Sequence, residues 1–103
     1  MKILKAKTSH PKKQIFPISD LNYNLYYEKN KSKLVNGAEE ILEGAEMIDP
    51  IQVKKYNKSK TPRYGAGGKI YREREYGVWK GNQRVTAAKK LGYTHIEGII
   101  IND

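Results

Sequence analysis

Residues 76–92 have the sequence YGVWKGNQRVTAAKKLG, which predicts a strand, a short turn and a helix in immediate succession. Tyr76, Val78 and Trp79 favour a strand, because aromatic and β-branched side chains pack well on a pleated surface. Gly81 then supplies the backbone freedom that a sharp turn needs. This stretch therefore predicts a strand that leads directly into the first turn of a helix.

The helix that follows has a predicted beginning, end and buried face. Asn82 is a favoured N-cap residue, and Gly92 lies where a helix C-cap glycine is expected. Val85, Ala88 and Leu91 share one face at spacings of three residues. We expect a helix over 82–91 that packs this apolar stripe against the rest of the chain.

A helix that begins directly after a strand presents backbone N–H groups and the positive end of the helix dipole, which together attract anions. Arg84 in the first turn adds a planar guanidinium that matches phosphate oxygens. The predicted phosphate- or nucleotide-binding residues are Gly81, Asn82, Gln83 and Arg84. A competing interpretation pairs Arg84 with Asp49 or with an acid near the C-terminus. We favour the anion role because of the position of Arg84 in the strand–turn–helix.

The same residues resemble the fingerprint of the ParB/sulfiredoxin-like superfamily: a glycine, a variable residue, a His or Arg and then Arg, opening a helix. Here the fingerprint is Gly81-Asn82-Gln83-Arg84, with small residues after it. Residues 14–21, 40–53 and 94–103 are similar to a first strand, a helix with a following Pro-aliphatic strand, and a closing strand of that superfamily. The resemblance implies an α+β fold with a small mixed sheet and flanking helices, and the predicted strands over 50–56 and 70–80 add a basic hairpin. It also implies that the turn wraps nucleotide phosphates.

The chain departs from the family pattern at three points. Asn82 stands where a sulfiredoxin has its catalytic Cys, and the chain has no Cys, so thiolate chemistry is excluded. CTP-hydrolysing ParB proteins tend to show Glu-Arg-Arg where this chain has Asn82-Gln83-Arg84, so one acid and one cation of that motif are missing. The chain ends at Asp103, without room for a helix-turn-helix or dimerisation domain. We expect residues 1–103 to form one ParB-like domain.

Periodicity and turn residues predict the remaining elements. Strands are expected over 14–21, 50–56, 70–80 and 94–101, and residues 1–13 are either a basic lead-in or a short edge strand. Pro17 places the strand over 14–21 at an edge or at a bulge, because proline cannot donate a ladder hydrogen bond. A helix is expected over 33–46, with an apolar face formed by Leu34, Ala38, Ile41, Leu42 and Ala45.

The chain carries a formal net charge of +9, with 20 Lys and Arg against 11 acids, which predicts a polyanionic partner. Cations gather in the predicted hairpin, where the expected nucleic-acid-binding residues are Lys54, Lys55, Lys58, Lys60, Arg63, Lys69, Arg72 and Arg74. Tyr56, Tyr64 and Tyr71 are interleaved with them. These rings either stack bases or cover a thin core, and both interpretations stay open.

Other motifs indicate little chemistry. Residues 65–69 (GAGGK) lack the Ser or Thr of a phosphate loop, so a flexible hairpin tip is favoured. His10 and His95 have no second ligand at metal-binding spacing, so we expect no metal site. No window approaches the roughly 18 apolar residues of a membrane span, and the N-terminus is too charged for a signal peptide. We expect a cytoplasmic protein without membrane contact.

Two functions follow from these patterns. The favoured one is a small basic ParB-like module of a phage, plasmid or other mobile element that binds DNA, RNA or an acidic host protein. Its turn at 81–84 would be a vestigial nucleotide-phosphate site. The alternative is a nucleotide-dependent enzyme of ParB-like fold, of NTPase, kinase or nuclease type, using ATP or CTP with Mg. The acids that we expect near the turn at 81–84 are Asp20, Glu28 and Asp49. None of them belongs to a catalytic motif, so we expect binding rather than catalysis.

Overall fold

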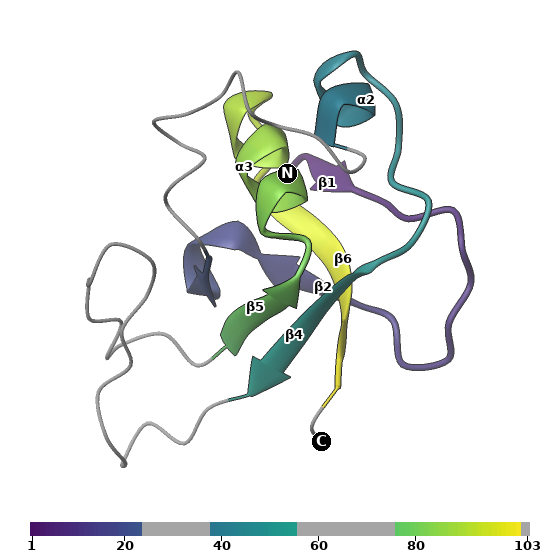
Figure 1. Ribbon diagram of the computed structural model, residues 1–103, viewed down its shortest axis with the longest axis vertical. Helices are drawn as coiled ribbons and strands as arrows, with labels where there is room; N and C mark the ends of the chain where they lie inside the picture. Colours follow the sequence, from purple (N-terminus) through teal and green to yellow (C-terminus); the bar gives the residue numbers. More distant parts are fainter. Residues whose placement is uncertain (24–37, 56–75, 102–103) are drawn as a thin grey trace.

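A computed structural model describes residues 1–23, 38–55 and 76–101 (Figure 1). Within these residues the chain forms a small mixed α/β domain with a six-stranded sheet and two α-helices. The coarse α+β prediction is therefore confirmed. Predictions for residues 24–37, 56–75 and 102–103 lie outside the described residues.

The elements follow the chain in this order: β1 (Ile3–Leu4), β2 (Gln14–Pro17), the 3-10 helix η1 (Ile18–Asp20), β3 (Leu21–Asn22), α2 (Ala38–Leu42), β4 (Ile51–Lys55), β5 (Tyr76–Lys80), α3 (Asn82–Lys90) and β6 (His95–Ile100).

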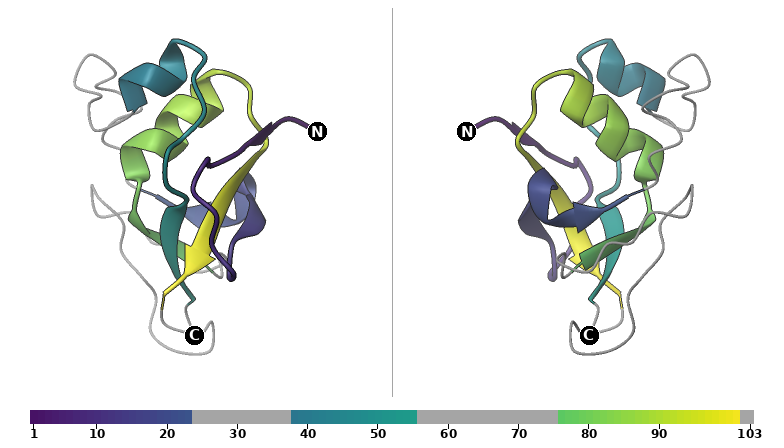
Figure 2. Two further views of the ribbon diagram at one scale, coloured as in Figure 1. Left: turned by 90° about the vertical axis from the view of Figure 1, so that its right-hand side faces the viewer. Right: turned by 90° about the vertical axis from the view of Figure 1, so that its left-hand side faces the viewer.

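Strand β6 organises the sheet. It pairs in parallel with β1 and β4 and antiparallel with β2. Strand β4 pairs antiparallel with β5, and β5 pairs in parallel with the short strand β3. In Figures 1 and 2 the two helices, which contact each other, lie above β4, β5 and β6. The sheet thus brings the β4–β5 ladder and the start of α3 to the same side of the molecule.

The core lies between the sheet and α3. Its largest fully buried side chains are Leu4, Leu21, Ile41, Ile51, Ile96, Val53 and Val85. The predicted stripe of α3 is confirmed, because Val85 and Ala88 are buried and Leu91 packs against the core. Alternation along β4 is also confirmed, since Ile51 and Val53 are buried while Gln52 between them is half-buried.

The predicted strand over 14–21 is wrong in its second half. Strand β2 ends at Pro17, and Ile18 begins the 3-10 helix, where its N–H donates to the carbonyl of Thr94 at 2.9 Å. In the described part of the chain β2 pairs only with β6, as expected for an edge strand that contains proline. Residues 3–4 form β1, which confirms the edge-strand interpretation of the N-terminal segment.

The predicted helix over 33–46 ends earlier than expected. Strand-like and turn geometry replaces helix after Leu42, where Gly44 has φ +98° and its N–H donates to the carbonyl of Ile41 at 2.9 Å. A glycine in the left-handed region is a common helix terminator. Ala45 is exposed as a result, and it does not join the buried face.

Candidate functional site

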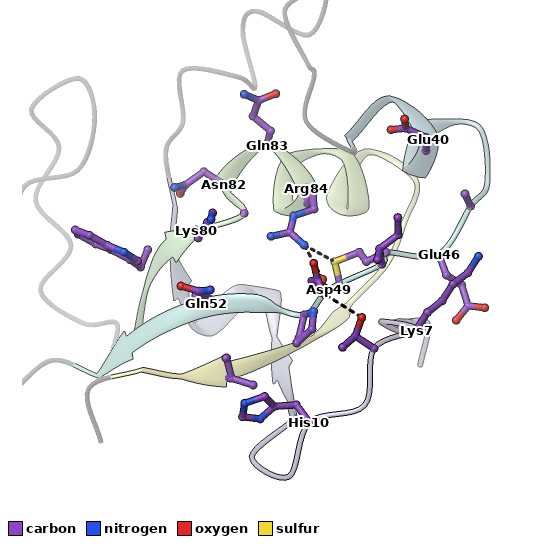
Figure 3. Close-up of a pocket in the computed structure, with 18 residues that line it drawn as sticks. Lys7, His10, Glu40, Glu46, Asp49, Gln52, Lys80, Asn82, Gln83 and Arg84 are labelled. Carbon is purple, nitrogen blue, oxygen red and sulfur yellow. Dashed lines mark hydrogen bonds between the residues drawn. The ribbon is translucent and has the colours of Figure 1, made fainter.

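An open depression beside the start of α3, called here the α3 groove, contains the whole predicted phosphate turn (Figure 3). Its walls are formed by Lys7, Thr8 and His10, by residues 45–50 between α2 and β4, and by residues 79–84. Gln52 and Ile99 line it between these walls. The groove is open to solvent and has a volume of about 1190 Å³.

Gly81 is required at the turn for two reasons. Its φ of +113° lies in the left-handed region, and a Cβ there would lie 2.6 Å from Cγ2 of Ile51. Gly81 itself is the N-cap residue of α3, so the prediction that Asn82 caps the helix is wrong. Asn82 is instead the first helical residue, and its Nδ2 donates to the carbonyl of Val78 at 3.4 Å. The turn is therefore as tight as the sequence predicted, with a different cap.

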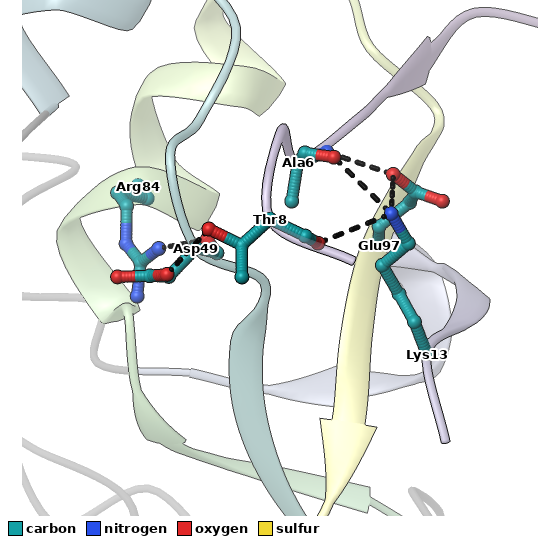
Figure 4. A network of polar contacts seen from close by, with 6 residues as sticks. All are labelled: Ala6, Thr8, Lys13, Asp49, Arg84 and Glu97. Carbon is teal, nitrogen blue, oxygen red and sulfur yellow. Dashed lines mark hydrogen bonds and ion pairs between the residues drawn. The ribbon is translucent and has the colours of Figure 1, made fainter. Parts of the chain in front are cut away.

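Arg84 holds two walls of the groove together. Its Nη1 donates to the backbone carbonyl of Asp49 at 2.6 Å and lies 3.8 Å from the sulfur of Met47. Thr8 donates its hydroxyl to the Asp49 carboxylate at 2.8 Å (Figure 4). Burial lowers the pKa of Arg84 below its ordinary value, and the nearby Asp49 carboxylate opposes that shift. This contact matches the competing interpretation, which paired Arg84 with Asp49, although the hydrogen bond goes to the backbone carbonyl and not to the carboxylate.

The end of the β4–β5 ladder contains a bulge that the sequence analysis missed. Gln52 pairs with Lys80, but the next residue of β4, Val53, pairs with Val78. Strand β5 therefore has one extra, unpaired residue at this point, Trp79. Bulges re-aim side chains and are frequent next to functional sites. Trp79 is 61% exposed.

Cations surround this exposed tryptophan. The Nζ atom of Lys54 lies 3.6 Å from the centroid of the Trp79 ring, and Lys80 next to it is exposed. Lys54 lies opposite Gly77, so it is the diagonal neighbour of Trp79 on the ladder. In the sequence, Trp79 predicted only a strand. The sequence signal for a functional role is the position of the single tryptophan directly before Lys80 and the predicted turn.

Charged side chains of both signs line the α3 groove. Lys80 and Asn82 lie at one end, and Glu40, Glu46 and Lys7 lie at the other (Figure 3). Both glutamates are exposed, as is Asp49.

Most of the predicted nucleic-acid-binding segment lies outside the described residues. Lys54 is half-buried and Lys55 is exposed at the end of β4. The cations outside the described part are Lys58, Lys60, Arg63, Lys69, Arg72 and Arg74, together with the interleaved tyrosines and the GAGGK stretch. Asp20 is exposed in η1, and Glu28 is outside the described residues.

Neither a scan against protein-family models nor searches among curated proteins and solved structures found a match for this chain. Residues 1–23, 38–55 and 76–101 contain no group of three or more His, Cys, Asp or Glu side chains that could hold a metal ion. In the same residues no helix has the length and apolar character needed to cross a membrane.

Proposed function

We propose that the chain binds nucleic acid through the β4–β5 surface, defined as Lys54, Lys55, Trp79 and Lys80. The observation that carries this proposal is the exposed ring of Trp79 beside Lys54 and Lys80. Aromatic rings among cations bind nucleic acids by base stacking and by attraction of phosphates. Exposed charges that contact phosphates release counterions, which makes such binding strong at low salt.

A single exposed apolar side chain on a protein surface needs no function. Three features of Trp79 support a functional role. It is the extra residue of a bulge, it has a cation over its ring, and it lines the same groove as the turn at 81–84. The net charge of +9 further supports a polyanionic partner.

We also propose that the domain is a distant ParB/sulfiredoxin-like module from a phage, plasmid or other mobile element, acting in the cytoplasm. Support for the relationship comes from β5 leading through Gly81 directly into α3, with Arg84 in the first turn. A free nucleotide, ATP or CTP with Mg, is the second candidate ligand, because Gly81, Asn82, Gln83 and Arg84 all line the groove. Calorimetric titration with ATP, CTP and GTP tests this second candidate. Affinity no tighter than millimolar for all three nucleotides would contradict nucleotide binding.

The test of nucleic-acid binding is fluorescence anisotropy with a labelled oligonucleotide of about 16 nucleotides, single-stranded and as a duplex. We expect affinity to fall at least tenfold between about 50 and about 200 mM salt. The triple variant Lys54→Gln, Lys55→Gln, Lys80→Gln should bind at least about tenfold more weakly. The slope of log affinity against log salt concentration should fall by about one for each phosphate contact removed.

The matched control is Lys5→Gln, Lys12→Gln, Lys90→Gln, which removes the same charge from exposed lysines elsewhere on the molecule. We expect the control to lose much less affinity than the β4–β5 variant. Equal losses in the two variants would contradict the proposed surface. The absence of binding to either oligonucleotide would contradict the proposed function and would favour an acidic protein partner.

A further inference from the structure

We infer that the β4–β5 surface selects single-stranded nucleic acid, with one unpaired base stacked on the ring of Trp79. The inference rests on the proposed nucleic-acid binding and names the form of ligand that this surface takes. Its basis is the geometry of the bulge and the position of Lys54 over the ring.

The bulge brings an aromatic ring and a cation to the same surface. Consecutive side chains of a regular strand point to opposite faces of a sheet. Trp79 and Lys80 are consecutive, and both are exposed and line the α3 groove. The extra residue in β5 breaks the alternation at this point. A base on the ring would therefore have a phosphate-binding cation next to it.

Lys54 marks the face of the ring on which a base would stack. Its ammonium lies 3.6 Å from the ring centroid, about where a stacked base would contact the ring. Base stacking on an aromatic side chain is worth about 1–3 kcal/mol, which is comparable to or larger than a cation–π contact of a lysine, so a base can replace the ammonium of the half-buried Lys54. The displaced ammonium of Lys54 then becomes available to a neighbouring phosphate.

A duplex cannot use this ring in the same way. Bases within a duplex are stacked on one another, and a protein reaches only their edges in the grooves unless a base is flipped out at a cost. An unpaired base offers its face without that cost. The ring of Trp79 thus favours single strands, whereas Lys80 attracts the phosphates of both forms.

The chain contains one tryptophan, so intrinsic tryptophan fluorescence reports on Trp79 alone. The experiment titrates the full chain at low salt with an oligonucleotide, first as a single strand and then as its duplex. We expect the single strand to quench the fluorescence and to bind at least about tenfold more tightly than the duplex, in line with the contribution of one stacked base. Trp79→Ala should lose about this factor for the single strand and little for the duplex, and Trp79→Phe should keep most of the affinity.

Circular dichroism checks that both variants fold, which we expect because the side chain is 61% exposed. Equal affinity for the two forms with unchanged fluorescence would overturn the inference and leave the proposed function in place. Single-strand affinity in Trp79→Ala equal to that of the parent chain would overturn it as well. The absence of binding to both forms would overturn the proposed function together with the inference.

Discussion

Gly81 determines the geometry of the groove at the level of a single residue. Any side chain there meets two penalties, a left-handed backbone and a close approach to Ile51. Gly92 provides a matched comparison, because its φ is also positive (+85°) but nothing lies within 4 Å of the position of its Cβ. The two glycines therefore separate the backbone penalty from the packing penalty.

Gly81→Ala should lower the free energy of unfolding by about 3 kcal/mol, the sum of about 1–2 for the left-handed backbone and about 1–3 for overpacking against Ile51. Gly92→Ala should lose only the backbone part, about 1–2 kcal/mol. Urea unfolding of both variants measures the difference. Equal losses would show that Ile51 moves aside and that the turn does not need the space.

Three features at this scale differ in how far the sequence predicts them. The contact of Arg84 with Asp49 was only the competing interpretation of that arginine, whereas the need for Gly81 followed from local turn chemistry. The exposure of Trp79 did not, because an aromatic residue in a predicted strand is expected to pack. Its position depends on the register between β4 and β5, which involves residues far apart in the chain.

At the scale of elements, Glu97 on β6 positions the connection between β1 and β2. Its Oε1 accepts a hydrogen bond from the N–H of Ala6 at 2.7 Å and lies 3.5 Å from Nζ of Lys13 (Figure 4). Lys13 also donates to the carbonyls of Ala6 and Thr8, at 3.2 and 3.4 Å. These contacts hold the segment that forms one wall of the α3 groove.

Glu97→Ala should lower the free energy of unfolding by about 1–3 kcal/mol, because it leaves the partly buried N–H of Ala6 without its acceptor. Glu97→Gln keeps an acceptor oxygen for the N–H of Ala6 and removes the charge, so its loss should be smaller than that of Glu97→Ala. Thermal or urea unfolding measures both. Equal losses would mean that the ion pair with Lys13, and not the backbone hydrogen bond, carries the stabilisation.

Elements with strong local signals were predicted well, and those set by tertiary pairing were not. The helix over 82–91 and the strand over 94–101 have apolar patterns that match α3 and β6 closely. The end of β2 at Pro17 and the parallel pairing of β3 with β5 depend on a few hydrogen bonds between segments that are far apart in the sequence. Two-residue strands such as β3 leave no period-2 pattern for sequence reasoning to detect.

At the scale of the whole molecule, the charges of the described residues are unevenly placed. Acidic side chains gather between Glu39 and Asp49, and Lys54, Lys55 and Lys80 lie on the β4–β5 ladder. The other described cations lie in the N-terminal segment and in α3: Lys2, Lys5, Lys7, Lys12, Lys13, Arg84, Lys89 and Lys90. Sequence composition predicted a polyanionic partner and an uneven charge distribution. It could not predict that one groove would join the turn at 81–84 to an exposed aromatic ring, because that requires the folded sheet.

The most direct test of the central claim is an NMR titration of the isotopically labelled 103-residue chain with a single-stranded oligonucleotide at low salt. The measurement follows backbone amide shifts together with the indole N–H of Trp79. The account predicts the largest changes at that indole and at the amides of 52–55 and 79–84. Changes confined to residues 39–49, or no changes at all, would contradict it.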